Sequence, residues 1–156
     1  MGAFHAYDIR GIYGKDFSKS DCHKIGYFLV DLLKTDKVLV GCDARISSPE
    51  IFEALCDGIT DAGADVYSVG LATTPMIYFG TAKHNFISSV QITASHNPKE
   101  YNGMKISGKD ALPIGFDSGL KFIKEKIDSN TPIIKASTKG KIIDFDIKSE
   151  YLKFLK

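Results

Sequence analysis

The chain has 156 residues, a formal net charge of +1 and a hydrophobic content of 44%, which is the size and composition of one soluble globular domain. A charge so close to zero gives no reason to expect nucleic acid or an anionic membrane as a partner. No apolar run approaches the ~20 residues of a membrane span, and the polar start of the chain is not a signal peptide. Three widely spaced cysteines (Cys22, Cys42 and Cys56) fit free thiols in a reducing cytoplasm better than a disulfide framework or a zinc site.

The first half of the chain alternates between helical and strand patterns of apolar residues. In chain order, the patterns predict a helix from about Cys22 to Leu33 capped by Ser20 or Asp21, a strand at 37–41, a helix from Pro49 to about Gly63, a strand at 64–69, and a helix from Thr74 to about His84.

The second half continues the alternation, with strands expected at 86–93 and 103–107, a helix at 116–127, and loops at 108–115 and 129–140, of which the second is a candidate for disorder. We therefore predict an α/β fold, a three-layer α/β/α sandwich with a mixed, mainly parallel sheet. A last amphipathic helix starts near Ile147 and stops at Lys156. Such an ending fits a chain cut from something longer, and equally a short helix that folds back onto this domain.

Two clusters in the first third of the chain could bind an anion. Arg10 precedes Gly11, so its planar guanidinium could meet a phosphate or carboxylate, although an ion pair with Asp8 is the simpler reading. The stretch 41–45, Gly-Cys-Asp-Ala-Arg, leads into a helix start, which is a ready anion-binding geometry. It carries neither a Walker A nor a G-x-G-x-x-G pattern, and its aspartate could simply pair with Arg45.

A serine loop, Thr93–Pro98, follows the predicted strand at 86–93. The residue before a proline avoids helical geometry, so Asn97 ends any regular element there. Ser95 and His96 then lie at the carboxyl end of a buried strand, where ligands bind in open α/β sheets. Taken alone, this sequence is more often an ordinary hydrogen-bonded turn.

A fourth cluster, Tyr101–Lys105, contains Asn-Gly, which we expect to form a turn that brings Lys105 back toward Ser95. Acyl transfer by a serine triad is one candidate activity. However, G-x-S-x-G is absent, and neighbouring side chains in an extended segment point apart, so His96 is a poor base for Ser95. Phosphoryl transfer fits better, because Arg10, Lys105 and backbone amides supply positive charge around a moving phosphoryl group.

In this order the four clusters resemble the first domain of the α-D-phosphohexomutases, the phosphoglucomutase/phosphomannomutase superfamily. The matching stretches are Tyr7–Gly11, Gly41–Arg45, Thr93–Pro98 and Tyr101–Lys105, which together span most of the chain. Thr-Ala-Ser-His-Asn-Pro followed closely by Tyr-Asn-Gly-x-Lys is highly specific. Its form is closer to the phosphomannomutase/phosphoglucomutase group than to the phosphoglucosamine mutases.

The resemblance implies an intramolecular phosphotransferase that interconverts hexose 1-phosphate and hexose 6-phosphate, of glucose or mannose, through a hexose 1,6-bisphosphate. Ser95 would carry the phosphoryl group, with Mg²⁺ bound to one of its oxygens. Lys105 would act as general acid or base, and Arg10 would stabilise transferring charge. The implied catalytic residues are Ser95, Lys105, Arg10 and His96; those implied to position substrate or phosphate are Tyr7, Asn97, Asn102 and Arg45; and Ser95 is the implied metal ligand.

Family members are several-fold longer and have four domains, and their Asp-rich metal loop, sugar-recognition loop and phosphate clamp do not occur in this sequence. We therefore expect residues 1–145 to form domain I and residues 146–156 to begin a helix toward an absent second domain. The chain alone is expected to be inactive, to bind Mg²⁺ weakly or not at all, and to self-associate through apolar surface. Its expected partners are hexose phosphates and the remaining mutase domains. The alternative is a non-catalytic module for a phospho-ligand or a protein partner.

Overall fold

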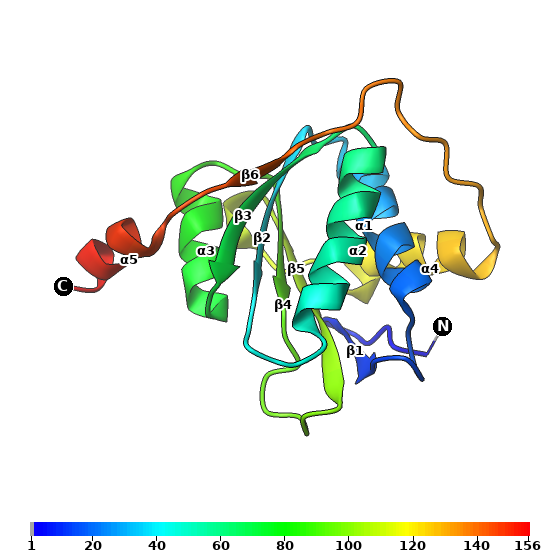
Figure 1. The fold of residues 1–156 in the computed structure, drawn as a ribbon, viewed down its shortest axis with the longest axis horizontal. Coiled ribbons are helices and arrows are strands. Elements are labelled where there is room, and N and C mark those ends of the chain that lie inside the picture. The colour runs from blue at the N-terminus through cyan, green and yellow to red at the C-terminus, as the bar shows by residue number, and fades with distance from the viewer. Residues whose placement is uncertain (1) are drawn as a thin grey trace.

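The computed structural model describes residues 2–156, which contain one six-stranded sheet in the order β1-β5-β4-β2-β3-β6 (Figure 1). The strands are β1 (Ile9–Ile12), β2 (Lys37–Cys42), β3 (Asp65–Leu71), β4 (Ser88–Ile92), β5 (Tyr101–Gly108) and β6 (Ile142–Asp144). The helices are α1 (Lys19–Leu33), α2 (Ser48–Asp61), α3 (Thr74–Lys83), α4 (Lys121–Asp128) and α5 (Lys148–Leu155). A 3₁₀ turn (Lys109–Ala111) lies in the loop predicted at 108–115, and a π turn (Phe116–Leu120) precedes α4.

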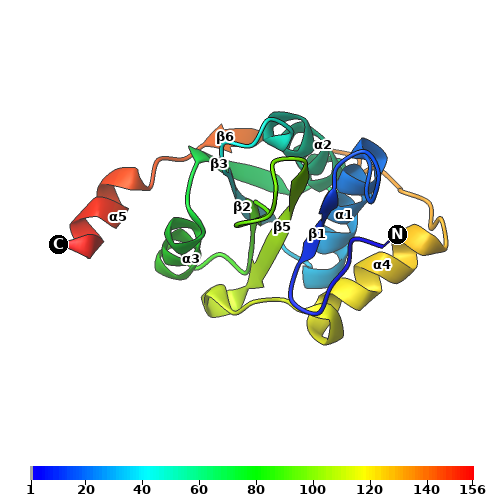
Figure 2. The ribbon, with the colours of Figure 1, turned by 90° about the horizontal axis from the view of Figure 1, so that it is seen from below.

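The predicted three-layer fold with a mixed, mainly parallel sheet is confirmed. β2 pairs in parallel with β3 and β4, and β3 pairs in parallel with β6. β5 is antiparallel to both β4 and β1. Helices α1 and α2 cover one face of the sheet and α3 covers the other (Figure 2). The sequence analysis missed β1 and β6, because strands of four and three residues are too short to show alternation.

The start of α1 differs from the prediction. Its N-cap is Ser18, and neither Ser20 nor Asp21 occupies that position. The Ser18 hydroxyl accepts a hydrogen bond from the backbone N–H of Asp21 at 3.2 Å, and the Asp21 carboxylate accepts one from the N–H of Ser18 at 2.8 Å. This reciprocal capping box satisfies two N–H groups at the helix start, which explains why Asp21 lies three residues inside the helix.

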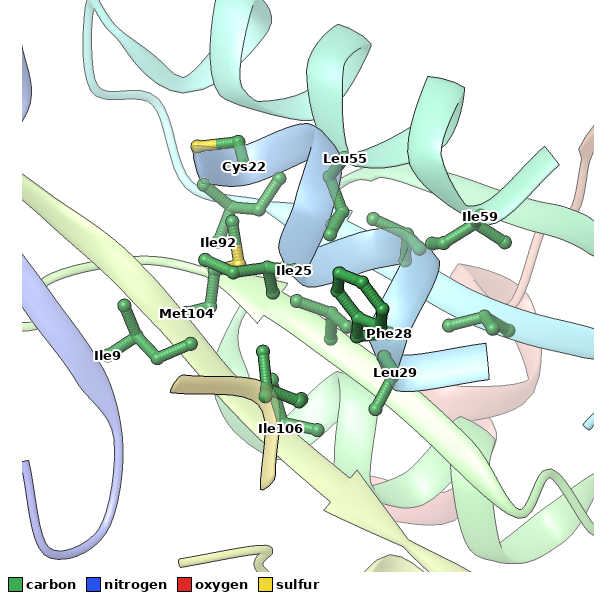
Figure 3. Close-up of a cluster of buried hydrophobic side chains, with 14 of the residues drawn as sticks. Ile9, Cys22, Ile25, Phe28, Leu29, Leu55, Ile59, Ile92, Met104 and Ile106 are labelled. Carbon is green, nitrogen blue, oxygen red and sulfur yellow. The ribbon is translucent and has the colours of Figure 1, made fainter. Parts of the chain in front are cut away.

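The main core lies between the sheet and the helices α1, α2 and α4. Its buried side chains include those labelled in Figure 3: Ile9, Cys22, Ile25, Phe28, Leu29, Leu55, Ile59, Ile92, Met104 and Ile106. Glycines bring α1 and α2 into backbone contact, since a Cβ placed on Gly58 would lie 1.9 Å from the carbonyl oxygen of His23. A smaller apolar cluster of Leu39, Ile77 and Phe86 packs beneath α3.

The segment 129–141 is irregular, as predicted, but hydrogen bonds fasten it to the helical layer. Ala136 donates its N–H to the carbonyl of Asp61, and Gly140 donates to the carbonyl of Thr60, at 2.8 and 2.9 Å. The Tyr27 hydroxyl donates to the carbonyl of Ile134 at 3.0 Å. These anchors give the segment a defined course across α1 and α2, which differs from the disorder expected of it.

The amphipathic pattern after Ile147 does form a helix, α5, which extends away from the sheet beside α3 (Figure 1). The ring of Phe79 on α3 contacts those of Tyr151 and Phe154, with centroids 5.4 and 4.9 Å apart. Within residues 2–156, no helix is long and apolar enough to cross a membrane.

Candidate active site

The loop after β4 presents Ser95 in a strained turn. Asn97 donates its N–H to the carbonyl of Ala94 at 3.1 Å, and Ser95 has a φ of +55°, in the left-handed region that side chains other than glycine seldom adopt. The hydroxyl of Thr93 accepts the N–H of Ser95 at 3.0 Å. Ser95 and His96 are exposed. The expectation of an extended segment at Ser95 is therefore wrong, because the chain turns sharply there.

Arg45 binds the backbone of this loop. One terminal nitrogen donates to the carbonyls of Pro98 and Tyr101 at 2.8 and 3.0 Å. The other donates to the carbonyls of Ser95 and Asn97 at 2.8 and 2.9 Å. The family resemblance implies that Arg45 positions substrate or phosphate, and these contacts commit its terminal N–H groups to the protein.

A polar network behind Arg45 reaches into the domain. Asp43 lies 3.4 Å from Nε of Arg45, which matches the ion pair considered from the sequence, and it accepts a hydrogen bond from the Ser48 hydroxyl at 3.1 Å. The side-chain amide of Asn102 donates to the hydroxyls of Ser47 and Ser48 at 2.9 and 3.0 Å. Asn102 is fully buried, so its side-chain contacts are with this network.

Arg10 and Lys105 reach the same end of the sheet from β1 and β5. Arg10 pairs with Gly103 across the two strands, and Lys105 pairs with Gln91 of β4. Arg10 donates to the side-chain oxygen of Asn97 at 3.2 Å. The ammonium of Lys105 lies 3.6 Å from the carboxylate of Asp8, so Asp8 pairs with Lys105 instead of Arg10.

The predicted turn at Asn102-Gly103 is wrong. Both residues lie inside β5, and the pairing of β5 with β4 places Lys105 opposite Gln91, four positions before Ser95. A Cβ on Gly103 would lie 1.9 Å from the carbonyl oxygen of Ile9. Glycine is present here because β1 approaches closely, which is a second common use of glycine in a strand.

Of the eight predicted site residues, the structure links Arg10 to Asn97 and Arg45 to the backbone of Ser95 and Asn97. Tyr7 is 80% exposed in the segment before β1. Asp8 and Ser48 contribute to the site although the sequence analysis gave them no role there. Lys105, the partner of Asp8, and Asn102, one partner of Ser48, are distant in sequence, so no local pattern indicated these contacts.

Known proteins resemble this chain over most of its length. A family model described as phosphoglucomutase/phosphomannomutase, alpha/beta/alpha domain I, matches residues 1–133. The chain belongs to this family. It is 37% identical over 153 residues to a phosphomannomutase of Klebsiella pneumoniae, covering 97% of this chain and 98% of that relative. It is also 37% identical to a phosphomannomutase of Escherichia coli, of which it spans 34%.

A solved structure shares the fold of this phosphoglucomutase/phosphomannomutase domain. A family protein from Burkholderia thailandensis superposes with a TM-score of 0.83 at 31% identity, covering 97% of this chain and 34% of that one. The chain thus spans about a third of some relatives and nearly all of another.

The described residues of the domain do not form a complete site for Mg²⁺, the ion that the family resemblance implies. Among residues 2–156, no three His, Cys, Asp or Glu side chains come together in a way that could hold a metal. A hard cation takes about six oxygen ligands, and Ser95 would supply one. Two carboxylates at this end of the sheet, Asp43 and Asp8, are engaged by Arg45 and Lys105.

Proposed function

We propose that this chain is the nucleophile domain of a hexose phosphate mutase, in which Ser95 carries the phosphoryl group. The observation that supports the proposal best is the loop itself. An exposed serine hydroxyl stands in a left-handed turn, and the guanidinium of Arg10 is bonded to Asn97 two residues further on. Preorganised positive charge beside a fixed oxygen is what phosphoryl transfer requires.

The proposed reaction moves the phosphoryl group between Ser95 and a sugar. The bond from phosphorus to the Ser95 oxygen breaks as a bond to the free hydroxyl of a hexose 1- or 6-phosphate forms, giving a hexose 1,6-bisphosphate. The neutral amine of Lys105 takes the proton of that hydroxyl and becomes an ammonium, and the Ser95 oxygen takes up one proton from solvent in exchange. The reverse step, with the other phosphate of the bisphosphate, reloads Ser95.

The remaining residues have roles that follow from their positions. Arg10 faces charge that spreads over the phosphoryl oxygens during transfer. Asp8, 3.6 Å from Lys105, holds that ammonium in place by charge attraction. His96 and Asn97 follow Ser95 in the loop and position its surroundings, with Asn97 fixed by its hydrogen bond from Arg10. No step is assigned to Mg²⁺, because no three His, Cys, Asp or Glu side chains among residues 2–156 come together to hold it.

The proposal predicts that the chain alone takes up a phosphoryl group on Ser95 but does not complete the mutase reaction. Incubation with glucose 1,6-bisphosphate should slowly add one phosphoryl group, located on Ser95 by mass spectrometry of peptides. Catalytic conversion of glucose 1-phosphate to glucose 6-phosphate should be undetectable, because the sugar-recognition and phosphate-clamp loops of the family do not occur in the chain. Closure of a complete cleft would also keep water away from the phosphoserine.

Two variants test the assignment of the nucleophile. Ser95→Ala should abolish phosphoryl uptake, whereas Ser129→Ala, which removes an exposed hydroxyl after α4, should leave it unchanged. In a full-length mutase that contains this domain, Ser95→Ala should lower turnover by several orders of magnitude. Phosphoryl uptake that persists in Ser95→Ala would remove Ser95 from this role. Binding of the bisphosphate without any uptake would favour the non-catalytic module.

A further inference from the structure

The two terminal nitrogens of Arg45 have no N–H group left for a ligand. Its two terminal nitrogens make four hydrogen bonds, to the carbonyls of Ser95, Asn97, Pro98 and Tyr101, all between 2.8 and 3.0 Å. Nε lies 3.4 Å from Asp43, and the side chain is 13% exposed. A guanidinium has five N–H donors in a fixed planar fork; the four at the terminal nitrogens all face protein carbonyls, and Nε lies on the side of the ion pair with Asp43.

We propose that Arg45 is a positioning residue that holds the serine loop in its transfer-competent shape and makes no contact with phosphate. The effect of Arg45 on phosphoryl transfer rests on the proposed function, whereas its effect on the conformation of the loop does not. The four carbonyls that Arg45 binds come from both arms of the loop, before and after Pro98. The Arg45 side chain therefore holds together the two arms of the loop that connects β4 to β5.

The loop needs such a tie because its conformation is not self-supporting. The left-handed φ of Ser95 is unfavourable for a residue with a Cβ, and it persists only where surrounding contacts determine it. The N–H groups of His96 and Lys99 make no hydrogen bond to a backbone carbonyl in the described part of the chain, so they are available to an anion at the loop.

Arg45 is itself held from behind by the buried polar network. Asp43 accepts from the Ser48 hydroxyl at 3.1 Å, and the Ser48 hydroxyl accepts from the Asn102 amide at 3.0 Å. Asn102 and Ser48 are buried. Asn102, Ser48, Asp43 and Arg45 thus form a continuous series of polar contacts from the interior to the serine loop. The buried Asn102 therefore supports the conformation of the site.

Amide hydrogen exchange measured by NMR on the intact chain tests the tie without any assumption about function. The reporters are the N–H groups of Asn97 and Tyr101, whose hydrogen bonds close the turns of the loop. In Arg45→Gln and in Arg45→Lys, which keeps the charge but not the fork, both amides should exchange about tenfold faster or more. Amides of α1 should be unchanged.

Arg10→Gln is the matched control for exchange, since it removes an arginine that makes a single hydrogen bond to a side chain of the same loop. Its effect on the two reporter amides should be less than about twofold. Unchanged exchange at Asn97 and Tyr101 in a folded Arg45→Lys chain would overturn the inference. If Arg45→Gln fails to fold, Arg45→Lys alone decides.

The rate of Ser95 loading by glucose 1,6-bisphosphate separates positioning from phosphate contact. Because Arg45 has no donor for the ligand, Arg45→Lys should lower the saturated loading rate about tenfold or more and leave the half-saturating concentration within about twofold. A large rise in that concentration with an unchanged saturated rate would show direct phosphate binding and contradict the inference. Absence of loading in the unmodified chain would count against the proposed function, while the exchange measurement still decides the role of Arg45.

Discussion

The face of the sheet covered by α1 and α2 and the loop edge that carries Ser95 are held together by different kinds of interaction. The covered face depends on buried apolar side chains such as Phe28 and Leu55, and on glycines that let two helices touch. The loop edge is exposed and depends on directional hydrogen bonds to one guanidinium. Packing tolerates many sequences of similar volume, whereas the loop requires one particular side chain with a fixed geometry.

This contrast predicts that substitutions in the two regions fail differently. A change between the helices should lower the free energy of unfolding of the whole domain, because the apolar cluster is shared by the sheet and three helices. A change at the loop edge should loosen the loop and slow phosphoryl transfer while the rest of the domain remains folded.

The largest effect is expected from Gly58→Ala. The added Cβ would lie 1.9 Å from the carbonyl oxygen of His23 and 2.9 Å from the backbone nitrogen of Tyr27, so α1 and α2 would have to separate. We expect a loss of about 3 kcal/mol or more in the free energy of unfolding, measured by chemical denaturation.

Gly70→Ala is the matched control, because nothing lies within 4 Å of the added Cβ and the cost comes from a φ of +69° alone. That cost should be about 1–2 kcal/mol. A smaller loss in Gly58→Ala than in Gly70→Ala would show that the two helices can shift apart easily, and that the covered face is not tightly packed.

The same contrast decides how much the sequence alone could predict. Helical and strand periodicity comes from burial of one side of each element, so the positions of α1, α2, α3 and the long strands follow from it. Glycine is ambiguous in this respect. Gly103 looks like part of a turn after Asn102, and the nearness of Ile9 that explains it is a contact across 94 positions of the sequence, which no local pattern reveals.

Motifs name the residues of the loop edge but not their partners. Arg45 reads as an anion-binding group because a guanidinium near a helix start is suited to that role. Its four carbonyl partners lie 50 to 56 positions away in the sequence. Likewise Asp8 precedes Arg10 by two positions yet pairs with Lys105, because β1 is antiparallel to β5.

A smaller effect is expected from the one buried carboxylate that joins the helices of the covered face. Asp61 accepts from His23 at 2.8 Å and pairs with Lys139 at 3.2 Å. Burial by itself raises the pKa of Asp61, but the hydrogen bonds from His23 and Lys139 outweigh it and lower the pKa below its usual value of 3.8. The carboxylate therefore contributes stability above that value and loses it as the pH falls through the folded pKa.

Asp61→Asn should accordingly lower the free energy of unfolding by about 1 kcal/mol at neutral pH, and the difference from the unmodified chain should shrink below about pH 4. Asp57→Asn is the control, because Asp57 is half-exposed and 3.8 Å from Lys139. A difference for Asp61→Asn that stays constant down to low pH would show that the carboxylate charge contributes nothing to the covered face.

Ser95→Gly should separate function from stability at the loop edge. Glycine adopts positive φ without steric cost, so the substitution should raise the free energy of unfolding by about 0.5–1 kcal/mol while it abolishes phosphoryl uptake. Lys34→Gly, at the left-handed end of α1 with a φ of +53°, should give a similar gain without loss of uptake. A destabilised Ser95→Gly chain would show that the serine side chain itself supports the loop.

The smallest perturbation is chemical labelling of the three cysteines, which lie in both regions. Cys22 and Cys56 are fully buried in the α1/α2 layer, and burial, with the nearby charges of Asp21 and Asp57 respectively, raises the pKa of each thiol to about 12. Cys42 ends β2 at the loop edge and is partly exposed, although burial raises its pKa as well. Because the thiolate is the reactive form, iodoacetamide should modify Cys42 first in the folded chain and all three thiols in denaturant.

Cys42→Ser should remove the early labelling completely, as followed by intact mass. Early labelling of Cys22 or Cys56 in that variant would require the contact between α1 and α2 to open under native conditions. The face covered by α1 and α2 would then be more mobile than the loop edge. The contrast between a rigid packed face and a loop held by Arg45 would be reversed.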